Sequence, residues 1–181
     1  MATENKAVIT LFGATGDLAK RKLYTALFKL YQKGYLADHF ALLGTSRHDY
    51  SDEEFQELVR NSIKDVEESR DGEAADFSKH FFYKAHDVTK PEHYTILKER
   101  IEELDKQFGT EGNRLFYMSM APQFFGTIAM NLKKQGLLCD DGFNRLVIEK
   151  PFGRDFDSAK KLNDALSQTF DENQIFRIDH Y

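Results

Sequence analysis

The stretch that most restricts the fold of this chain is residues 7–21, which read AVITLFGATGDLAKR. The uncharged, apolar run Ala7–Phe12 predicts a strand buried on both faces of a parallel sheet. Gly13 and Gly16 interrupt this run, and a helical pattern begins at Asp17. A strand, a glycine turn and a helix N-terminus in succession direct backbone N–H groups and the positive end of a helix dipole toward one spot. The stretch therefore predicts a site for a phosphate group.

The rest of the chain alternates short apolar runs with amphipathic helical segments. Five further strands are predicted at residues 40–44, 80–85, 114–121, 144–150 and 174–181. Helices are expected to begin near residues 17, 51, 91, 122 and 155, and residues 69–75 read as a solvated loop. Ser51 and Glu54 have the spacing of a capping box. The pattern predicts an α/β, doubly wound, Rossmann-like parallel sheet of about six strands with helices on both faces, in the order 3-2-1-4-5-6.

Length and charge narrow the kinds of ligand. The 181 residues suit one domain with a sizeable core. A net charge of -5 gives no general attraction to nucleic acid or an anionic membrane, so an anionic ligand needs a local site. The single cysteine, Cys139, excludes an internal disulfide and fits a reducing compartment. With neither a signal-peptide pattern nor an apolar stretch of membrane-spanning length, we expect a cytoplasmic protein.

The glycine pattern is G-x-x-G-x-x-A, formed by Gly13, Gly16 and Ala19. It differs from the more common G-x-G-x-x-G, although alanine at the last position still allows the helix to pack closely on the strand. No Gly-Lys-Ser/Thr follows, which disfavours a P-loop. A tight turn that holds no ligand remains the alternative for this pattern taken by itself.

Three further strands carry candidate cofactor ligands. Arg47 follows the second predicted strand, where an arginine can contact the 2′-phosphate of NADP, so NADP is favoured. Asp49 leaves some NAD binding open, and a solvated loop residue is the alternative for Arg47. Asp87 and Val88 end the third strand beside the expected adenine position, although Asp87 can equally cap the next helix. Tyr117, in the fourth strand, completes the predicted cofactor-binding residues.

The last two predicted strands carry candidate catalytic residues. Lys150 lies between Glu149 and Pro151, at a strand end that faces the cofactor crevice in the predicted sheet, and a surface turn is the alternative. The peptide before Pro151 is a candidate cis bond. Asp179 and His180 resemble an acid–base pair, but adjacent strand residues point to opposite faces. Asp179 therefore needs a histidine from elsewhere, and the chain offers no obvious candidate.

A Tyr-x-x-x-Lys pair, Tyr94 and Lys98, matches a motif of short-chain dehydrogenases. The pair precedes the fourth predicted strand, and Tyr94 belongs to the apolar face of a helix. We therefore expect Tyr94 to pack in the core and not to act in catalysis.

Three motifs, in one order and spacing, point to a known family. They are residues 13–19 (GATGDLA), 149–153 (EKPFG) and 177–181 (RIDHY). With these motifs the chain resembles the glucose-6-phosphate dehydrogenase family, in its bacterial form, along its whole length. Residues 40–47 and 113–122 are similar to that family as well.

The resemblance implies an oxidoreductase of the pentose phosphate pathway. Such an enzyme oxidises glucose 6-phosphate at C1 to 6-phosphogluconolactone and passes the hydride to NADP. The resemblance assigns Arg47 to the 2′-phosphate. It assigns the pyrophosphate to Gly13, Ala14, Thr15, Gly16, Asp17 and Leu18.

The same resemblance implies roles at the sugar. Lys150 is expected to touch both sugar and cofactor, and Pro151 is expected to be cis. His180 and Tyr181 are expected to help hold the sugar phosphate. Asp179 is expected to orient the histidine that takes the proton of the C1 hydroxyl, as in carboxylate–histidine general-base catalysis.

The sequence stops at Tyr181, inside a motif that continues with Leu-Gly-Lys in the family. We therefore expect residues 1–181 to be an NADP-binding domain without the α+β domain that carries the general-base histidine and the dimer interface. The fragment is expected to be inactive by itself, and the full-length enzyme to be a homo-oligomer. The alternatives are a stand-alone NADP sensor and a short-chain nucleotide-sugar reductase or epimerase, which the positions of Tyr94 and Lys98 disfavour.

Overall fold

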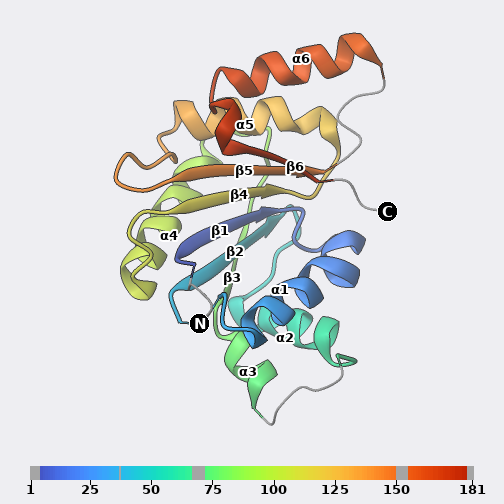
Figure 1. The fold of residues 1–181 in the computed structure, drawn as a ribbon, viewed down its shortest axis with the longest axis vertical. Helices are drawn as coiled ribbons and strands as arrows, with labels where there is room; N and C mark the ends of the chain where they lie inside the picture. The colour runs from blue at the N-terminus through green and yellow to red at the C-terminus, as the bar shows by residue number, and fades with distance from the viewer. Residues whose placement is uncertain (1–4, 37, 67–71, 150–154, 179–181) are drawn as a thin grey trace.

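A computed structural model describes residues 5–36, 38–66, 72–149 and 155–178. Its centre is a six-stranded sheet in the order β3-β2-β1-β4-β5-β6 (Figure 1). Every pair of neighbouring strands in this sheet is parallel. The strands are β1 Ala7–Phe12, β2 Phe40–Ser46, β3 Phe81–Ala85, β4 Arg114–Met118, β5 Asn144–Glu149 and β6 Ile175–Ile178. The predicted fold class and strand order are confirmed.

Helices cover both faces of the sheet (Figure 1). One face carries α1 Tyr24–Gln32, α2 Asp52–Ile63 and α3 Glu73–Ser78. The other face carries α4 His93–Phe108, α5 Phe125–Lys134 and α6 Phe156–Ser167. Successive strand residues point to opposite faces, so Val8 and Phe12 pack toward α4 while Ile9 and Leu11 pack toward α1. Burial on both faces explains why β1 has no charged residue.

Two helices begin at a residue whose side chain bonds the first turn. The N–H of Glu54 donates to Ser51 Oγ at 3.0 Å, and the N–H of Ser51 donates to Glu54 Oε1 at 3.1 Å, which confirms the capping box of α2. Asp155 Oδ1 accepts the N–H of Ser158 at 2.9 Å and caps α6. Pro91 lies in the turn before α4, which begins at His93.

The main differences from the sequence prediction concern β2, β4 and α3. β2 runs two residues further, to Ser46, and β4 ends at Met118, because the chain then leaves the sheet and makes a 3-10 turn, η2 Pro122–Phe124. Part of the predicted loop is helix α3. That helix buries Phe77, whose ring centroid lies 5.1 Å from that of Phe28 and 4.7 Å from that of Phe81. One large apolar residue in a polar stretch has no periodicity, so packing against α1 and β3 decides this helix.

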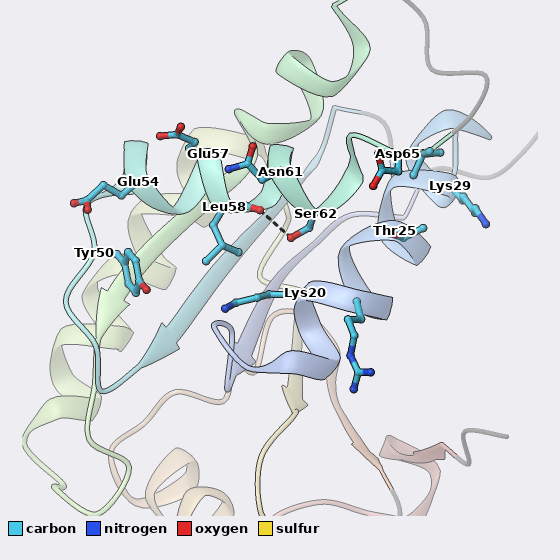
Figure 2. Close-up of a pocket in the computed structure, with 12 residues that line it drawn as sticks. Lys20, Thr25, Lys29, Tyr50, Glu54, Glu57, Leu58, Asn61, Ser62 and Asp65 are labelled. Atoms are coloured by element: carbon cyan, nitrogen blue, oxygen red, sulfur yellow. Dashed lines mark hydrogen bonds between the residues drawn. The ribbon is translucent and has the colours of Figure 1, made fainter.

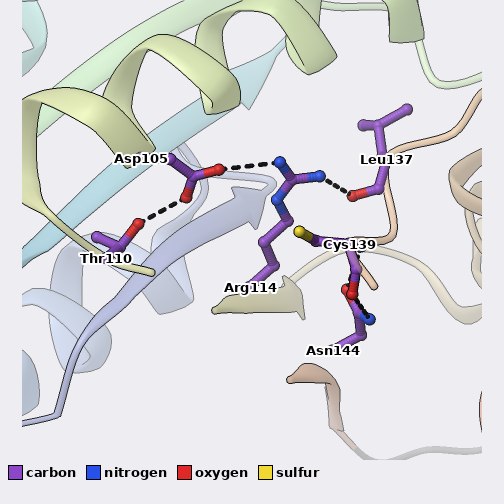
Figure 3. Close-up of polar contacts among 6 residues, drawn as sticks. All are labelled: Asp105, Thr110, Arg114, Leu137, Cys139 and Asn144. Carbon is purple, nitrogen blue, oxygen red and sulfur yellow. Dashed lines mark hydrogen bonds and ion pairs between the residues drawn. The ribbon is translucent and has the colours of Figure 1, made fainter. Parts of the chain in front are cut away.

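A buried ion pair joins several elements at the amino ends of the strands (Figure 3). Arg114 begins β4, and its Nη2 lies 2.9 Å from Asp105 Oδ2 of α4. Its Nη1 donates to the carbonyl oxygen of Leu137 at 2.5 Å, and the hydroxyl of Thr110 donates to Asp105 Oδ1 at 2.6 Å. Both charges are therefore hydrogen-bonded, as buried charges must be. The cluster stabilises the amino-terminal end of the sheet, away from the carboxyl ends of the strands.

Cys139 lies beside this cluster as a half-buried free cysteine. Its backbone N–H donates to Asn144 Oδ1 at 2.9 Å, and its carbonyl accepts from Asn144 Nδ2 at 2.8 Å (Figure 3). These two bonds attach the loop before β5 to the start of that strand, which gives Cys139 a structural setting.

Candidate functional site

The glycine turn after β1 has a backbone shape that only glycine accepts. Gly13 has a φ of +85°, and a Cβ at that position would lie 2.0 Å from the carbonyl oxygen of Ser119. The N–H groups of Gly13 and Ala14 donate to the carbonyl oxygen of Thr45 at 3.0 and 3.2 Å. The turn is therefore attached to β2 and pressed against the end of β4.

The helix that follows presents its N-terminus beside this turn. Asp17 and Leu18 are the first helical residues, and a wide π-helical turn, η1 Ala19–Leu23, precedes α1. The first N–H groups of a helix have no partner within the helix and can bind an anion. Tyr24 is fully buried under the turn, and its hydroxyl donates to the carbonyl oxygen of Ala14. This contact holds the turn at its predicted place between strand and helix.

A hollow of about 320 Å³ opens in front of the glycine turn. It lies at the carboxyl ends of β1 to β4, where the strand order reverses between β1 and β4. That switch point is where open α/β sheets bind their ligands. The lining residues that the sequence also singled out are Gly13, Thr15, Gly16, Arg47, Asp87 and Val88. The tertiary structure thus brings together candidates from three different strand ends.

Arg47 and Asp87 are two charged residues that line the hollow. The hydroxyl and the N–H of Thr89 donate to Asp87 Oδ1 at 2.7 and 2.9 Å and hold the pKa of Asp87 below its usual range. The positive charge of Arg47, which is exposed, is a smaller cause in the same direction. The alternative role of Asp87 as helix cap is wrong, because α4 begins six residues later at His93 with Glu92 as its N-cap.

Two buried polar side chains in the lining have no hydrogen-bond partner among the described residues. They are Thr45, through Oγ1, and His86, through both ring nitrogens. The ring of His86 packs edge-on against Tyr94, with centroids 4.5 Å apart, and lies 5.9 Å from Phe12. Burial, and next the nearby His93, lower the pKa of His86 to about 4, so its ring is neutral at pH 7.

Together with the glycine turn at the switch point, these atoms favour the hollow as the place of a polar ligand. A buried polar atom without a partner costs about 1–3 kcal/mol, and native proteins rarely leave one unpaired. Neither His86 nor Thr45 is among the site residues predicted from the sequence. The only available signal was their position at strand ends, because pairing and burial are tertiary properties.

Tyr117 lies apart from the hollow. It packs with the core on the α1 face and hydrogen-bonds the buried side chain of Glu149 on β5. Burial, with the Glu149 carboxylate, raises the pKa of Tyr117. Ala14, Asp17 and Leu18 also fall outside the lining. Ala14 and Asp17 are sequence neighbours of lining residues, and Leu18 follows Asp17 at the start of the helix.

The candidate catalytic and sugar-binding residues lie outside the described part of the chain. They are Lys150, Pro151, Asp179, His180 and Tyr181. Their roles stay predictions. Tyr94, by contrast, is fully buried, and its hydroxyl donates to the carbonyl oxygen of Val88 at 2.9 Å. This confirms its expected place in the core.

A second, larger hollow lies between α1 and α2 (Figure 2). Its volume is about 1110 Å³. Lys20 and Lys29 come from the first helical segment, while Glu54 and Glu57 come from α2. The hydroxyl of Ser62 is bonded within its own helix, to the carbonyl oxygen of Leu58 at 2.8 Å.

Within the described ranges, no group of three or more histidine, cysteine, aspartate or glutamate side chains could hold a metal ion. In the same ranges, every helix is too short or too polar to cross a membrane. The site must therefore be understood through its backbone turn, its arginine and its buried polar atoms.

A doubly wound parallel sheet with a glycine turn at its switch point defines the class of Rossmann-type dinucleotide-binding domains. The sequence model described as "Glucose-6-phosphate dehydrogenase, NAD binding domain" matches residues 10–181. The chain belongs to this family, and its cofactor is accordingly a nicotinamide dinucleotide.

Similar proteins agree with this assignment. The glucose-6-phosphate 1-dehydrogenase of Leuconostoc mesenteroides is 56% identical over 181 residues, which are 100% of this chain and 37% of that protein. The enzyme of Streptococcus pneumoniae is 53% identical over 177 residues, 98% of this chain and 36% of that protein. The chain thus spans little more than a third of the length of these relatives.

Solved structures show the same fold. A glucose-6-phosphate dehydrogenase in complex with its substrate glucose 6-phosphate superposes with a TM-score of 0.89 at 37% identity, covering 100% of this chain and 38% of that one. The Mycobacterium avium enzyme gives a TM-score of 0.82 at 31% identity, covering 97% of this chain and 36% of that one. A reductase domain of a non-ribosomal peptide synthetase, at 13% identity and a TM-score of 0.54, shares the fold alone.

Proposed function

We propose that this chain is the NADP-binding part of a glucose-6-phosphate dehydrogenase that oxidises glucose 6-phosphate to 6-phosphogluconolactone. The observation that carries the proposal is the hollow at the switch point. There Gly13 lets the turn lie against the end of β4. His86 and Thr45 contribute polar atoms that have no hydrogen-bond partner in the described part of the chain. Family membership supports the reaction, and the substrate named for the solved relative supports the sugar.

The described residues fit a dinucleotide. The helix N-terminus at Asp17 is suited to the pyrophosphate, as the glycine turn predicts. Asp87 and Val88 stand at the wall assigned to adenine. Arg47 stands at the rim, where a guanidinium can bind the 2′-phosphate with charge-assisted hydrogen bonds, which favours NADP over NAD.

The sugar side of the proposal rests on residues that the family resemblance assigns. Lys150 would contact sugar and cofactor, and His180 and Tyr181 would bind the sugar phosphate. Asp179 would orient a histidine supplied from beyond residue 181. NADP, when bound, supplies the acceptor for the C1 hydride. This chain's contribution is to hold and orient both partners, and we propose that the complete enzyme is a cytoplasmic homo-oligomer.

The cofactor assignment is tested by titrating NADP and NAD into the protein in a calorimeter. Arg47→Ala should raise the Kd for NADP about 10- to 100-fold, since a charge-assisted contact contributes about 1.5–3 kcal/mol. Its Kd for NAD should stay within about two-fold. Lys29→Ala is the matched control, because it removes an exposed positive charge from the other hollow. An unchanged NADP affinity in Arg47→Ala would remove Arg47 from the site.

The reaction is tested by following NADPH absorbance with glucose 6-phosphate. We expect the 181-residue chain to bind NADP yet form no NADPH, because we propose that the general-base histidine oriented by Asp179 is supplied from beyond residue 181. The same chain continued by the remaining two thirds of a relative should regain activity. Sustained turnover by the 181-residue chain would overturn this division of roles. Inactivity of the extended protein would favour the alternative of an NADP sensor.

A further inference from the structure

Tyr83 occupies an unusual position between two strand ends. It lies on β3 opposite Gly44 of β2, whose missing side chain leaves room for Phe55. Its ring packs against Phe55 and Tyr50, with centroids 5.3 and 5.4 Å away. The residue is 3% exposed. The ring is therefore held firmly, and its hydroxyl is aimed along the strands toward their carboxyl ends.

That hydroxyl bonds the chain on both sides of Arg47. It lies 2.5 Å from the carbonyl oxygen of His48 and 2.6 Å from Ser46 Oγ. Ser46 Oγ also accepts the N–H of His48 at 3.3 Å and the hydroxyl of Thr15 at 3.2 Å. The proton count is consistent when Tyr83 donates to His48 and Ser46 donates to Tyr83.

These bonds connect the glycine turn with the segment that carries Arg47. Thr15 lies in the turn, between Gly13 and Gly16, and Ser46 is the last residue of β2. At its backbone, the N–H of Tyr83 donates to Asp52 Oδ1 of α2 at 2.8 Å. Tyr83 is thus fixed to α2 at one end and fixes the rim of the hollow at the other.

Arg47 itself has a long, exposed side chain, so the place that its guanidinium reaches depends on where the backbone holds the residue. Holding a binding residue in place before the ligand arrives reduces the entropy lost on binding. We infer that Tyr83 is a positioning residue that fixes residues 46–48, so that Arg47 meets a phosphate on the 2′ position of the adenosine ribose. This inference deepens the proposed function and rests on it.

The test compares Kd values for NADP and NAD, by calorimetry, in Tyr83→Phe and the unchanged protein. The substitution keeps the ring and removes only the hydroxyl. The Kd for NADP should rise about three- to ten-fold, and the Kd for NAD less than about two-fold. Tyr31→Phe is the matched control, because Tyr31 packs against the same core cluster beside Phe40 and Phe77 and does not line the hollow.

Ser46→Ala provides an independent variant, because it removes the link between Thr15 and Tyr83 from the other side. It should lower the NADP preference in the same direction as Tyr83→Phe. Equal losses for both cofactors, in either variant, would show a merely structural role and overturn the inference.

Arg47→Ala separates this inference from the proposed function. A lowered NADP preference in Arg47→Ala, with an unchanged preference in Tyr83→Phe and Ser46→Ala, overturns the positioning role alone. An unchanged preference in Arg47→Ala overturns the assignment of the 2′-phosphate and the positioning role together.

Discussion

The two hollows of this domain differ in size and in the state of their polar groups. The larger one, between α1 and α2, encloses about 1110 Å³ and is lined by exposed charged side chains of both signs. The smaller one, at the strand ends, encloses about 320 Å³. It contains Thr45 Oγ1 and the ring of His86, which lack hydrogen-bond partners among the residues that the structure describes.

The unsatisfied buried polar atoms favour the smaller hollow as the ligand site, although the other hollow has the larger volume. Exposed charges are solvated by water, and pairs of them contribute about 0–1 kcal/mol. Buried orphan atoms cost more than that and imply a missing partner. The larger hollow is the space left between two helices, whereas the smaller one is shaped by three strand ends and a glycine turn.

The largest effect is expected from adding a side chain at Gly13, in the turn that borders the smaller hollow. Gly13→Ala should cost at least about 4 kcal/mol of unfolding free energy and abolish NADP binding, because its Cβ would overlap the carbonyl oxygen of Ser119. Gly34→Ala is the matched control, since Gly34 has a φ of +84° and a Cβ added there would meet no atom within 4 Å. It should cost only about 1 kcal/mol, measured by urea unfolding.

Normal NADP affinity in Gly13→Ala would contradict the placement of the cofactor at this turn. Equal losses of stability in the two alanine variants would show that φ alone, and no steric overlap, determines the cost.

A second experiment separates the site from its structural support. Asp105→Ala should lower the unfolding free energy by about 3–5 kcal/mol, because it leaves Arg114 buried without its carboxylate. The Kd for NADP of the folded fraction should stay unchanged, since the Asp105–Arg114 pair lies at the amino ends of the strands and the hollow lies at their carboxyl ends. A changed Kd for NADP in Asp105→Ala, with an unchanged unfolding free energy, would contradict this separation of site and structural support.

The low pKa of His86 should make the stability of the domain depend on pH. The unfolded chain takes up a proton at this residue as the pH falls below its ordinary 6.5, but the folded chain does so only near a pKa of about 4. Stability should therefore fall as the pH drops from 6.5 to 4, by up to about 3 kcal/mol from this residue.

His86→Phe keeps a ring beside Tyr94 and Phe12 and removes the titration. Urea unfolding at about pH 7 and about pH 4.5 should show a loss about 2–3 kcal/mol larger in the unchanged protein than in His86→Phe. His80, whose pKa burial also lowers, contributes equally to both proteins and cancels. Equal losses of stability in the two proteins would mean that the pKa of His86 in the folded state is close to its ordinary value.

The smallest effect is expected in the larger hollow. Glu57→Ala should change the NADP affinity by less than about two-fold and the unfolding free energy by less than about 0.5 kcal/mol, because the side chain is exposed. Calorimetry and urea unfolding check both values. A change of about ten-fold in the Kd for NADP would place the ligand between α1 and α2 and reverse the comparison.

Local patterns predicted much of the fold. The uncharged run of β1 and the capping box of Ser51 can each be recognised within a few residues, and both are present in the structure. The strand order followed from right-handed crossovers. Helix α3 escaped prediction, because its one buried aromatic, Phe77, is recognisable only from the rings that surround it.

The candidate site was predicted unevenly. Gly13 and Arg47 line the hollow, where the sequence places them: a turn with positive φ favours glycine, and an arginine at a strand end supplies a charge for a phosphate. Their contacts with a cofactor stay predictions. Tyr117 was placed in the site from its strand and lies apart from the hollow, against Glu149. Its strand was right, but the face and depth of a side chain depend on the neighbouring strands.

The sequence by itself determined the strand–turn–helix junction, because that junction depends on neighbouring residues. It also predicted the parallel sheet and the family, because these follow from short local patterns taken in their order along the chain. Only the tertiary structure decided how Thr15, Ser46 and Tyr83 bond one another, and that His86 is buried with no hydrogen-bond partner in the described ranges. These residues come from three strand ends that are far apart in sequence. Hydrogen bonding and desolvation act over a few ångströms in space, so their effects exist only once the strands have paired.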